Sequence, residues 1–245
     1  MSADRVGVDV DVESAVVRYR DESGDDQRSA RWQDVDVDGL IAAAPWRQFP
    51  QYPGQRHYPG MYWFATQQAL VVYESRLELA VLLAADYDRA VTRATGQPFM
   101  LAATVEGVVR RHVPDFLLMT DTGPVVVDVK PADRRDDPRT ARTLAWTNMV
   151  VQQRGWRYEV TSGPAPVELA NLRFLAGYRR VGLFDQQLTD RVRAITRSGM
   201  TLAEVLAAAP GPAHLARSAL LHLLWRQDIR VDLSVLLQPR TPVVV

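Results

Sequence analysis

Hydrophobic and polar positions alternate in the first twenty residues, where Val6, Val8, Val10 and Val12 are separated by small or acidic residues. A period of two predicts one or two strands over residues 6–20, with a turn at residues 22–26. Residues 30–62 lose this period and interleave Pro and Gly with aromatic side chains. We expect them to form a loop that packs as an arm over the following unit.

The middle of the chain changes from helical to strand periodicity and back. Ser75 with Glu78 three residues later has the capping-box pattern, which predicts a helix over residues 75–85. Three strands are expected next, joined by tight turns at residues 106–107 and 121–123, and then a helix ending at Gly155 and a last strand. The expected strands cover residues 99–105, 108–119, 125–130 and 156–160, and the second helix covers residues 139–154. This order predicts a compact α/β unit over residues 65–162.

The remaining residues show mainly helical patterns. We expect helices at residues 165–181, 185–198 and 213–227, a short helix capped by Thr201, and short strands at residues 230–233 and 241–245. Helices followed by a pair of short strands are typical of a winged-helix module. The predicted organisation is therefore an N-terminal arm (1–62), an α/β core (63–164) and a winged-helix-like domain (165–245).

Composition narrows the possible functions of this 245-residue chain, which is 47% hydrophobic and 24% charged. The absence of cysteine excludes disulfides, a thiolate nucleophile and a Cys-based zinc site. No apolar run is long enough to span a membrane, and the opening residues lack an apolar signal core. We therefore expect a cytoplasmic protein with no membrane partner.

The formal net charge of zero conceals an uneven distribution. Residues 1–45 carry 11 acidic and 5 basic residues, whereas residues 170–245 carry 10 basic and 5 acidic residues. A basic region is compatible with nucleic-acid binding, although a mixed solvated surface explains it equally well. Lys130 is the one lysine among the 29 basic residues. An ammonium can donate to a single oxygen or lose a proton, which a guanidinium does not do.

Four separated side chains predict a reaction centre. Asp128 and Lys130 lie two apart on an expected buried strand, so they face the same side. The hairpin brings Asp115 beside Asp128, and Glu78 can reach the same corner from its helix. Three carboxylates at one point repel each other unless a cation lies among them, and hard oxygen ligands favour Mg²⁺ or Mn²⁺. Such a metal acidifies water and stabilises a phosphate undergoing hydrolysis. Taken singly, each residue is more typical of a structural role than of a catalytic one, and the prediction depends on their joint pattern.

These residues resemble the PD-(D/E)XK, or restriction-endonuclease-like, superfamily, and more closely the TnsA endonuclease subunits of heteromeric transposases. The resemblance covers roughly residues 55–180. Its motifs are residues 73–80, Gln97-Pro98, Pro114-Asp115-Phe116 and residues 127–131. It implies a mixed sheet flanked by helices, a C-terminal winged-helix-like α domain, and double-stranded DNA at transposon ends as substrate.

The resemblance also implies roles and partners. Glu78, Asp115, Asp128 and the Val129 carbonyl would bind Mg²⁺, with Mn²⁺ as a substitute, and Lys130 would be the catalytic lysine. The chain would cut the 5′ ends of the transposon, while the DDE-type transposase TnsB cuts and joins the 3′ ends and the AAA+ regulator TnsC contacts the tail. The third acidic position is often Glu or Gln in this family and is the shorter Asp here.

Several alternatives stay open. Glu74 lies one helical turn from Glu78 and is the substitute ligand, and Gln97 either orients a ligand or forms a structural turn. Arg134, Arg135, Arg139 and Arg142 either follow DNA phosphates or form a solvated face. The four histidines are expected to be structural or exposed. The function itself could be that of a stand-alone repair or restriction nuclease, or of a non-cleaving DNA- or protein-binding scaffold.

Overall fold

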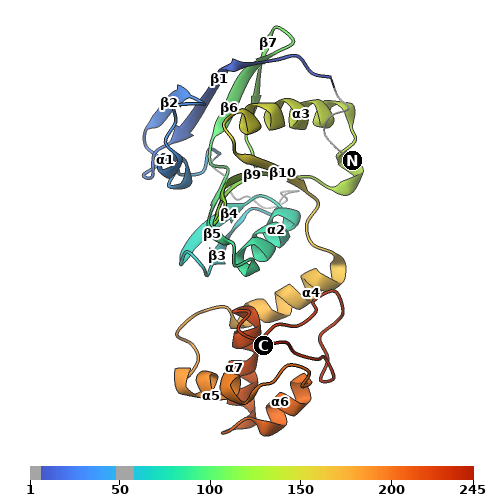
Figure 1. The fold of residues 1–245 in the computed structure, drawn as a ribbon. Helices are drawn as coiled ribbons and strands as arrows, with labels where there is room; N and C mark the ends of the chain where they lie inside the picture. Colours follow the sequence, from blue (N-terminus) through green and yellow to red (C-terminus); the bar gives the residue numbers. More distant parts are fainter. Residues whose placement is uncertain (1–6, 48–57) are drawn as a thin grey trace. The chain divides into compact units, whose positions relative to one another are not determined.

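The computed structural model describes residues 7–47 and 58–245 and divides into two compact units, one ending at Gly163 and one starting at Pro164. The chain is a mixture of helices and mainly antiparallel strands (Figure 1). In the first unit the elements are β1 (Val10–Arg20), β2 (Gln27–Arg31), α1 (Val37–Ile41), β3 (Gly60–Phe64), β4 (Ala69–Tyr73), α2 (Arg76–Tyr87), β5 (Val91–Gly96), β6 (Met100–Val105), β7 (Val108–His112), β8 (Phe116–Thr120), β9 (Gly123–Val129), α3 (Pro138–Gln153) and β10 (Arg157–Thr161).

Two four-stranded sheets form the first unit. The first sheet has the strand order β2-β1-β6-β7 and is antiparallel throughout. The second sheet has the order β10-β9-β8-β5, in which β10 is parallel to β9 and the other pairs are antiparallel. The hairpin of β3 and β4 is separate.

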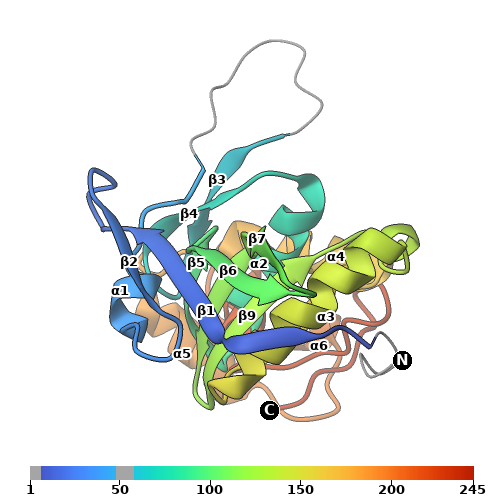
Figure 2. The ribbon, with the colours of Figure 1, turned by 90° about the horizontal axis from the view of Figure 1, so that it is seen from above.

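One core joins both sheets to α3, which lies alongside β1 and β6 (Figure 2). Val17 and Leu101 enter this core from the first sheet, Val126 from the second, and Trp146 and Val150 from α3. Trp32 is fully buried there and donates from its indole nitrogen to the Val150 carbonyl over 2.9 Å. α2 contacts β5 and β9 of the second sheet, together with β3 and β4, and α3 contacts β10. Both helices that the sequence predicts for the α/β core therefore pack on the second sheet.

Local chemistry explains the element boundaries. The Ser75 hydroxyl accepts from the Glu78 amide and begins α2, and Asp137 accepts from the Thr140 amide at the start of α3. The turn between β6 and β7 has positive φ at Glu106 (51°) and Gly107 (74°), as a two-residue hairpin requires. The cap predicted at Ser75 and the turn predicted at residues 106–107 are confirmed, whereas the Asp137 cap was not predicted.

The strand expected over residues 108–119 is wrong, because it is two strands in two different sheets. β7 ends at His112 and pairs with β6, whereas β8 begins at Phe116 and pairs with β5 and β9. Pro114 lies at this crossing, where a residue without an N–H cannot extend a ladder. The loop expected over residues 30–62 is wrong in part, because α1 and the start of β3 lie within it; β2, β4 and β5 were not predicted. Part of the expected Pro-aromatic arm, residues 48–57, lies outside the described residues.

The second unit is helical. Its elements are α4 (Pro166–Leu175), α5 (Gln186–Ile195), α6 (Leu202–Ala208) and α7 (Ala213–Trp225). His222 on α7 is buried, and its Nδ1 lies 2.7 Å from the Tyr178 carbonyl. The two predicted strands are wrong, since the described residues of this unit form only the isolated bridges Thr201–Pro242 and Arg230–Val244. Val243 bonds with Gly199 and Met200, whereas Val244 bonds with Arg230, so no continuous ladder forms.

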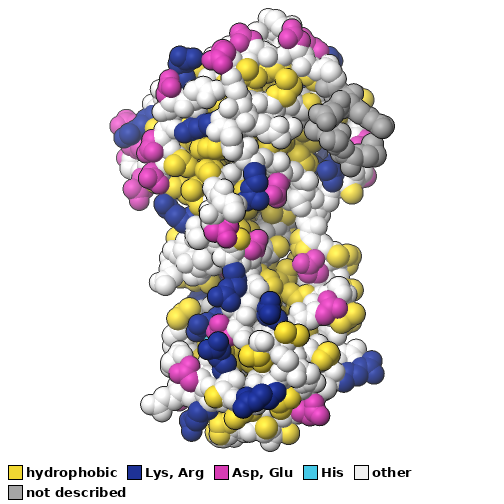
Figure 3. Space-filling model, in the orientation of Figure 1, with side chains coloured by type: hydrophobic (Ala, Val, Ile, Leu, Met, Phe, Trp, Pro, Cys, Tyr) yellow, Lys and Arg dark blue, Asp and Glu magenta, His cyan; other side chains and the backbone are white. Residues whose placement is uncertain are grey.

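Charge is distributed as the sequence indicates. Acidic side chains gather on the visible surface near β2 and α1, and arginines are prominent on the second unit (Figure 3). No helix in the described part of the chain combines the length and apolar character needed to cross a membrane.

Candidate active site

Two crossings of the chain between the sheets create the site. Between β5 and β6 the chain passes from the second sheet to the first through Gln97, and between β7 and β8 it returns through Asp115. The Gln97 amide donates to the Asp115 carbonyl over 2.8 Å, and the Asp115 amide donates to the Val127 carbonyl over 3.1 Å. These bonds hold Asp115 at the start of β8, beside the end of β9.

Lys130 follows the last residue of β9, and its ammonium lies between two carboxylates. Nζ is 3.0 Å from Oδ2 of Asp115 and 3.0 Å from Oδ1 of Asp128. Its third acceptor is the Val129 carbonyl at 3.3 Å. The Lys130 backbone is also fixed, because its amide donates to the Thr161 carbonyl and its carbonyl accepts from the Ser162 hydroxyl, each over 2.9 Å.

Asp128 is fully buried, and two residues that the sequence reasoning did not select contact its carboxylate. Nε2 of His112 lies 2.9 and 2.8 Å from the two carboxylate oxygens, and the Tyr158 hydroxyl donates to Oδ2 over 2.5 Å. His112 was expected to be structural or exposed, and its ring lies against the carboxylate of a candidate site residue. No local pattern identifies either contact, because β7 and β10 meet β9 only in the folded chain.

Glu78 is buried at the first turn of α2. Its carboxylate accepts from the Glu74 amide over 2.7 Å and from the Ser75 hydroxyl over 2.8 Å. The negative charge of Asp115 contributes to raising the pKa of Glu78, after the effect of burial. Glu74 itself points to a different partner, since its carboxylate lies 3.3 Å from Nη1 of Arg47.

The electrostatics reflect buried charges of the same sign. Burial, together with the charges of Asp115 and Glu74, raises the pKa of Glu78 to about 7. Burial and the charge of Asp128 raise the pKa of Asp115 despite its contact with Lys130. Burial also opposes ionisation of Asp128, but His112, Lys130 and Tyr158 outweigh it and lower the pKa of Asp128 to about 2. The Lys130 ammonium therefore does not offset the effects of burial and of Asp128 on the pKa of Asp115.

The ammonium of Lys130 is stabilised in its charged form. Burial lowers its pKa, but the charges and hydrogen bonds of Asp128 and Asp115 outweigh burial and raise it. Burial, followed by the charge of Asp128, raises the pKa of Tyr158 well above its ordinary value. Lys130 in this arrangement is a proton-bearing donor, not a base.

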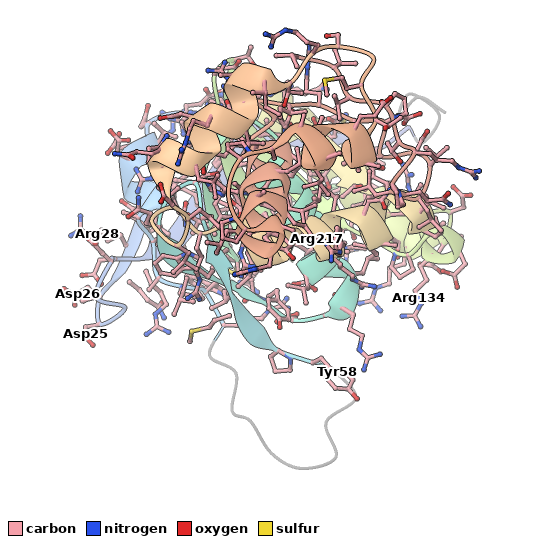
Figure 4. The ribbon with its side chains drawn as sticks, turned by 90° about the horizontal axis from the view of Figure 1, so that it is seen from below. Asp25, Asp26, Arg28, Tyr58, Arg134 and Arg217 are labelled. Carbon is pink, nitrogen blue, oxygen red and sulfur yellow. The ribbon has the colours of Figure 1, made fainter. Side chains whose placement is uncertain are left out.

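The weaker candidates occupy different positions. Gln97 is buried, and its Oε1 has no hydrogen-bond partner among the described residues. Arg134, Arg135, Arg139 and Arg142 are exposed, and Figure 4 shows Arg134 projecting outward. Arg142 forms an ion pair with Glu106 at the β6–β7 turn. The four arginines thus supply positive charge on the segment after β9, without a contact that assigns them to a ligand.

The donor chemistry of this corner fits a hard divalent cation in part. Glu78 and Asp115 have carboxylates with raised pKa values, and Gln97, whose backbone bonds that of Asp115, has a buried Oε1 without a partner. Both oxygens of Glu78 and Oδ2 of Asp115 already accept hydrogen bonds, so Oδ1 of Asp115 and Oε1 of Gln97 are the hard oxygens of these side chains without a hydrogen bond among the described residues. Asp128 does not complete the set here, because His112, Tyr158 and Lys130 occupy its oxygens. Within residues 7–47 and 58–245, no group of three or more His, Asp or Glu side chains is arranged to hold a metal ion.

Comparison with known proteins does not assign the chain. No protein-family model matches the sequence, and no curated protein shows significant similarity to it.

Proposed function

We propose that this chain is a metal-dependent DNA endonuclease of the PD-(D/E)XK type that serves as the TnsA-like subunit of a transposase. The observation that carries the proposal is the ammonium of Lys130, the only lysine, at 3.0 Å from both Asp115 and Asp128. If the single lysine had no function, nothing would favour its position between these two carboxylates over any other basic position of the chain.

The order of elements supports the same proposal. α2, β5, β8, β9, α3 and β10 follow one another, with β6 and β7 inserted after β5, and their strands lie in the order β5-β8-β9-β10. The final pair is parallel and connected through α3, as a parallel connection requires. A mixed four-strand sheet of this order suits the restriction-endonuclease-like core that the motifs imply.

The side chains divide the chemistry of phosphodiester hydrolysis between them. Mg²⁺ or Mn²⁺ held by Glu78 and Asp115 would supply a Lewis acid for the scissile phosphate. Lys130 keeps its proton, and the N–H that Asp115 would release on binding the metal would donate to a phosphate oxygen or to the attacking water. The exposed arginines from Arg134 to Arg142 would contact neighbouring phosphates of double-stranded DNA. Water attack would leave 5′-phosphate and 3′-hydroxyl ends.

The experiment compares cutting of transposon-end DNA in Mg²⁺ by the wild type, Lys130→Ala and Asp115→Asn, with TnsB- and TnsC-type partners from the same gene neighbourhood present. We expect both variants to lose cutting of the 5′ strand while 3′ joining by the partner persists. Asp86→Asn is the matched control, since Asp86 is a buried carboxylate that accepts from Tyr62 and Thr66. Wild-type cutting by Lys130→Ala refutes the proposal, and efficient cutting without partners favours a repair or restriction nuclease.

One observation favours a second candidate, a non-cleaving scaffold of the same fold. The oxygens of Asp128 are all engaged, and no metal-ligand group of three or more closes among the described residues. Calorimetric titration of the DNA complex with Mn²⁺ separates the two functions. Binding that Asp115→Asn abolishes supports the nuclease, and absence of binding supports the scaffold.

A further inference from the structure

Both oxygens of the Asp128 carboxylate are engaged by contacts inside the protein. Oδ1 contacts His112 and Lys130 over 2.9 and 3.0 Å, and Oδ2 contacts His112 and Tyr158 over 2.8 and 2.5 Å. The two His112 contacts come from one ring nitrogen shared between both oxygens, so three groups contact the carboxylate. Because the Asp128 side chain has no exposed surface, it has no open side from which an additional ligand could bind.

The residues that hold Asp128 come from separate parts of the fold. His112 ends β7 in the first sheet, and its ring meets Trp146 of α3 edge to face at 6.3 Å between centroids. Tyr158 lies on β10, which is paired in parallel with β9, the strand of Asp128. Residues of β7 and β10 therefore hold a carboxylate on β9, and α3 packs against one of them.

The held carboxylate in turn fixes the lysine. An ammonium has three N–H donors, and its three acceptors are Asp115, Asp128 and the Val129 carbonyl. We propose that His112 and Tyr158 are positioning residues that make Asp128 the anchor of Lys130, so that Asp128 orients the ammonium and does not bind the divalent ion. The catalytic meaning of this anchor rests on the proposed nuclease function. When Asp115 serves as a metal ligand, Asp128 and the Val129 carbonyl remain to hold the ammonium.

Two pairs of variants test the roles of these residues in cleavage. Tyr158→Phe and His112→Leu remove a donor to Asp128, whereas His112→Gln keeps an amide donor near the position of Nε2. We expect the first two to lower kcat about 10- to 100-fold, as loss of a supporting shell does, with unchanged KM for DNA and unchanged Mn²⁺ affinity. His112→Gln recovers part of the rate. Tyr62→Phe is the matched control, because it removes a buried hydroxyl bond of 2.9 Å to Asp86 and should leave the rate unchanged.

The single lysine allows a test that is independent of cleavage. In full-length protein labelled with ¹³C,¹⁵N-lysine, NMR reports only the Lys130 ammonium. We expect slow proton exchange with water in the wild type and Tyr62→Phe, and faster exchange in Tyr158→Phe and His112→Leu. If no variant changes this exchange, the anchor is refuted. Tighter Mn²⁺ binding with retained cutting in Tyr158→Phe also overturns it, because Asp128 would then be a metal ligand that the two residues withhold.

The two proposals fail in different ways. A wild type that never cuts DNA, with or without partners, defeats the nuclease proposal, and the ammonium signal still decides whether His112 and Tyr158 anchor Lys130. A wild type that cuts, together with unaltered kcat in both donor-deleted variants, defeats the anchor alone.

Discussion

Replacing Lys130 by methionine isolates the electrostatic role of the ammonium, because methionine keeps most of the aliphatic side chain. The change removes three hydrogen bonds and leaves Asp115 and Asp128 facing each other without a cation. Breaking a buried ion pair typically costs 3–5 kcal/mol, and the 26% exposure of the Lys130 side chain places the expected loss at the lower end, about 3 kcal/mol. In a unit of this size the loss lowers Tm by about 6–12 °C.

The loss depends on pH in a defined direction. Without the ammonium, mutual repulsion raises the pKa of the Asp115–Asp128 pair in the folded state above its unfolded value. A carboxyl with a raised folded pKa contributes stability that is fully present below the unfolded pKa and is lost as pH rises through the folded pKa. The Tm difference between the wild type and Lys130→Met should therefore grow from about pH 5 to pH 8.

Thermal unfolding followed by tryptophan fluorescence suits this measurement, since five of the six tryptophans precede Gly163. Arg142→Met is the control, because it breaks an exposed ion pair with Glu106 whose contribution is about 1 kcal/mol or less. A Tm loss in Lys130→Met that is equal at both pH values, or no larger than in the control, would refute the reasoning.

Three further predictions concern buried polar groups. Glu78→Gln should stabilise the metal-free protein relative to the wild type as pH rises through about 7, because the wild type must then ionise a buried carboxyl. The gain is at most about 3 kcal/mol, and urea unfolding at pH 5.5 and 8 measures the difference in the free energy of unfolding. Gln97→Met should raise metal-free stability by about 1 kcal/mol and weaken Mn²⁺ binding in calorimetry, because it removes the unpartnered Oε1; lower stability contradicts this. Burial lowers the pKa of His222, so its stabilising contribution is complete above 6.5 and is lost as pH falls below it; amide exchange in α7, corrected for intrinsic rates, should speed up in the wild type but not in His222→Gln.

Elements with local signals could be predicted from the sequence. Ser75 and Asp137 cap α2 and α3 through their own side chains, and positive φ at Gly107 closes the β6–β7 hairpin. Each signal acts within a few residues, so it needs no knowledge of the tertiary fold. The proximity of Asp115, Asp128 and Lys130 follows from strand alternation and one turn.

The remaining features depend on which strands become neighbours. Residues 108–119 contain strand-forming residues on both sides of Pro114, and only this proline marks the change from β7 to β8 and from one sheet to the other. β5 was missed because Thr92, Arg93 and Thr95 interrupt any apolar pattern. The contact of His112 with Asp128 requires that the end of one sheet meet the middle of the other, which no single segment encodes.

The attachment of Lys130 to Ser162 has a mechanical consequence. The Thr161 carbonyl accepts from the Lys130 amide, and the Ser162 hydroxyl donates to the Lys130 carbonyl. Only Gly163 separates Ser162 from the start of the second unit. A covalent path of very few bonds therefore connects the start of the second unit to the backbone segment that carries the Lys130 ammonium. Extra residues inserted after Gly163 would lengthen that covalent path without touching the two backbone bonds that hold Lys130.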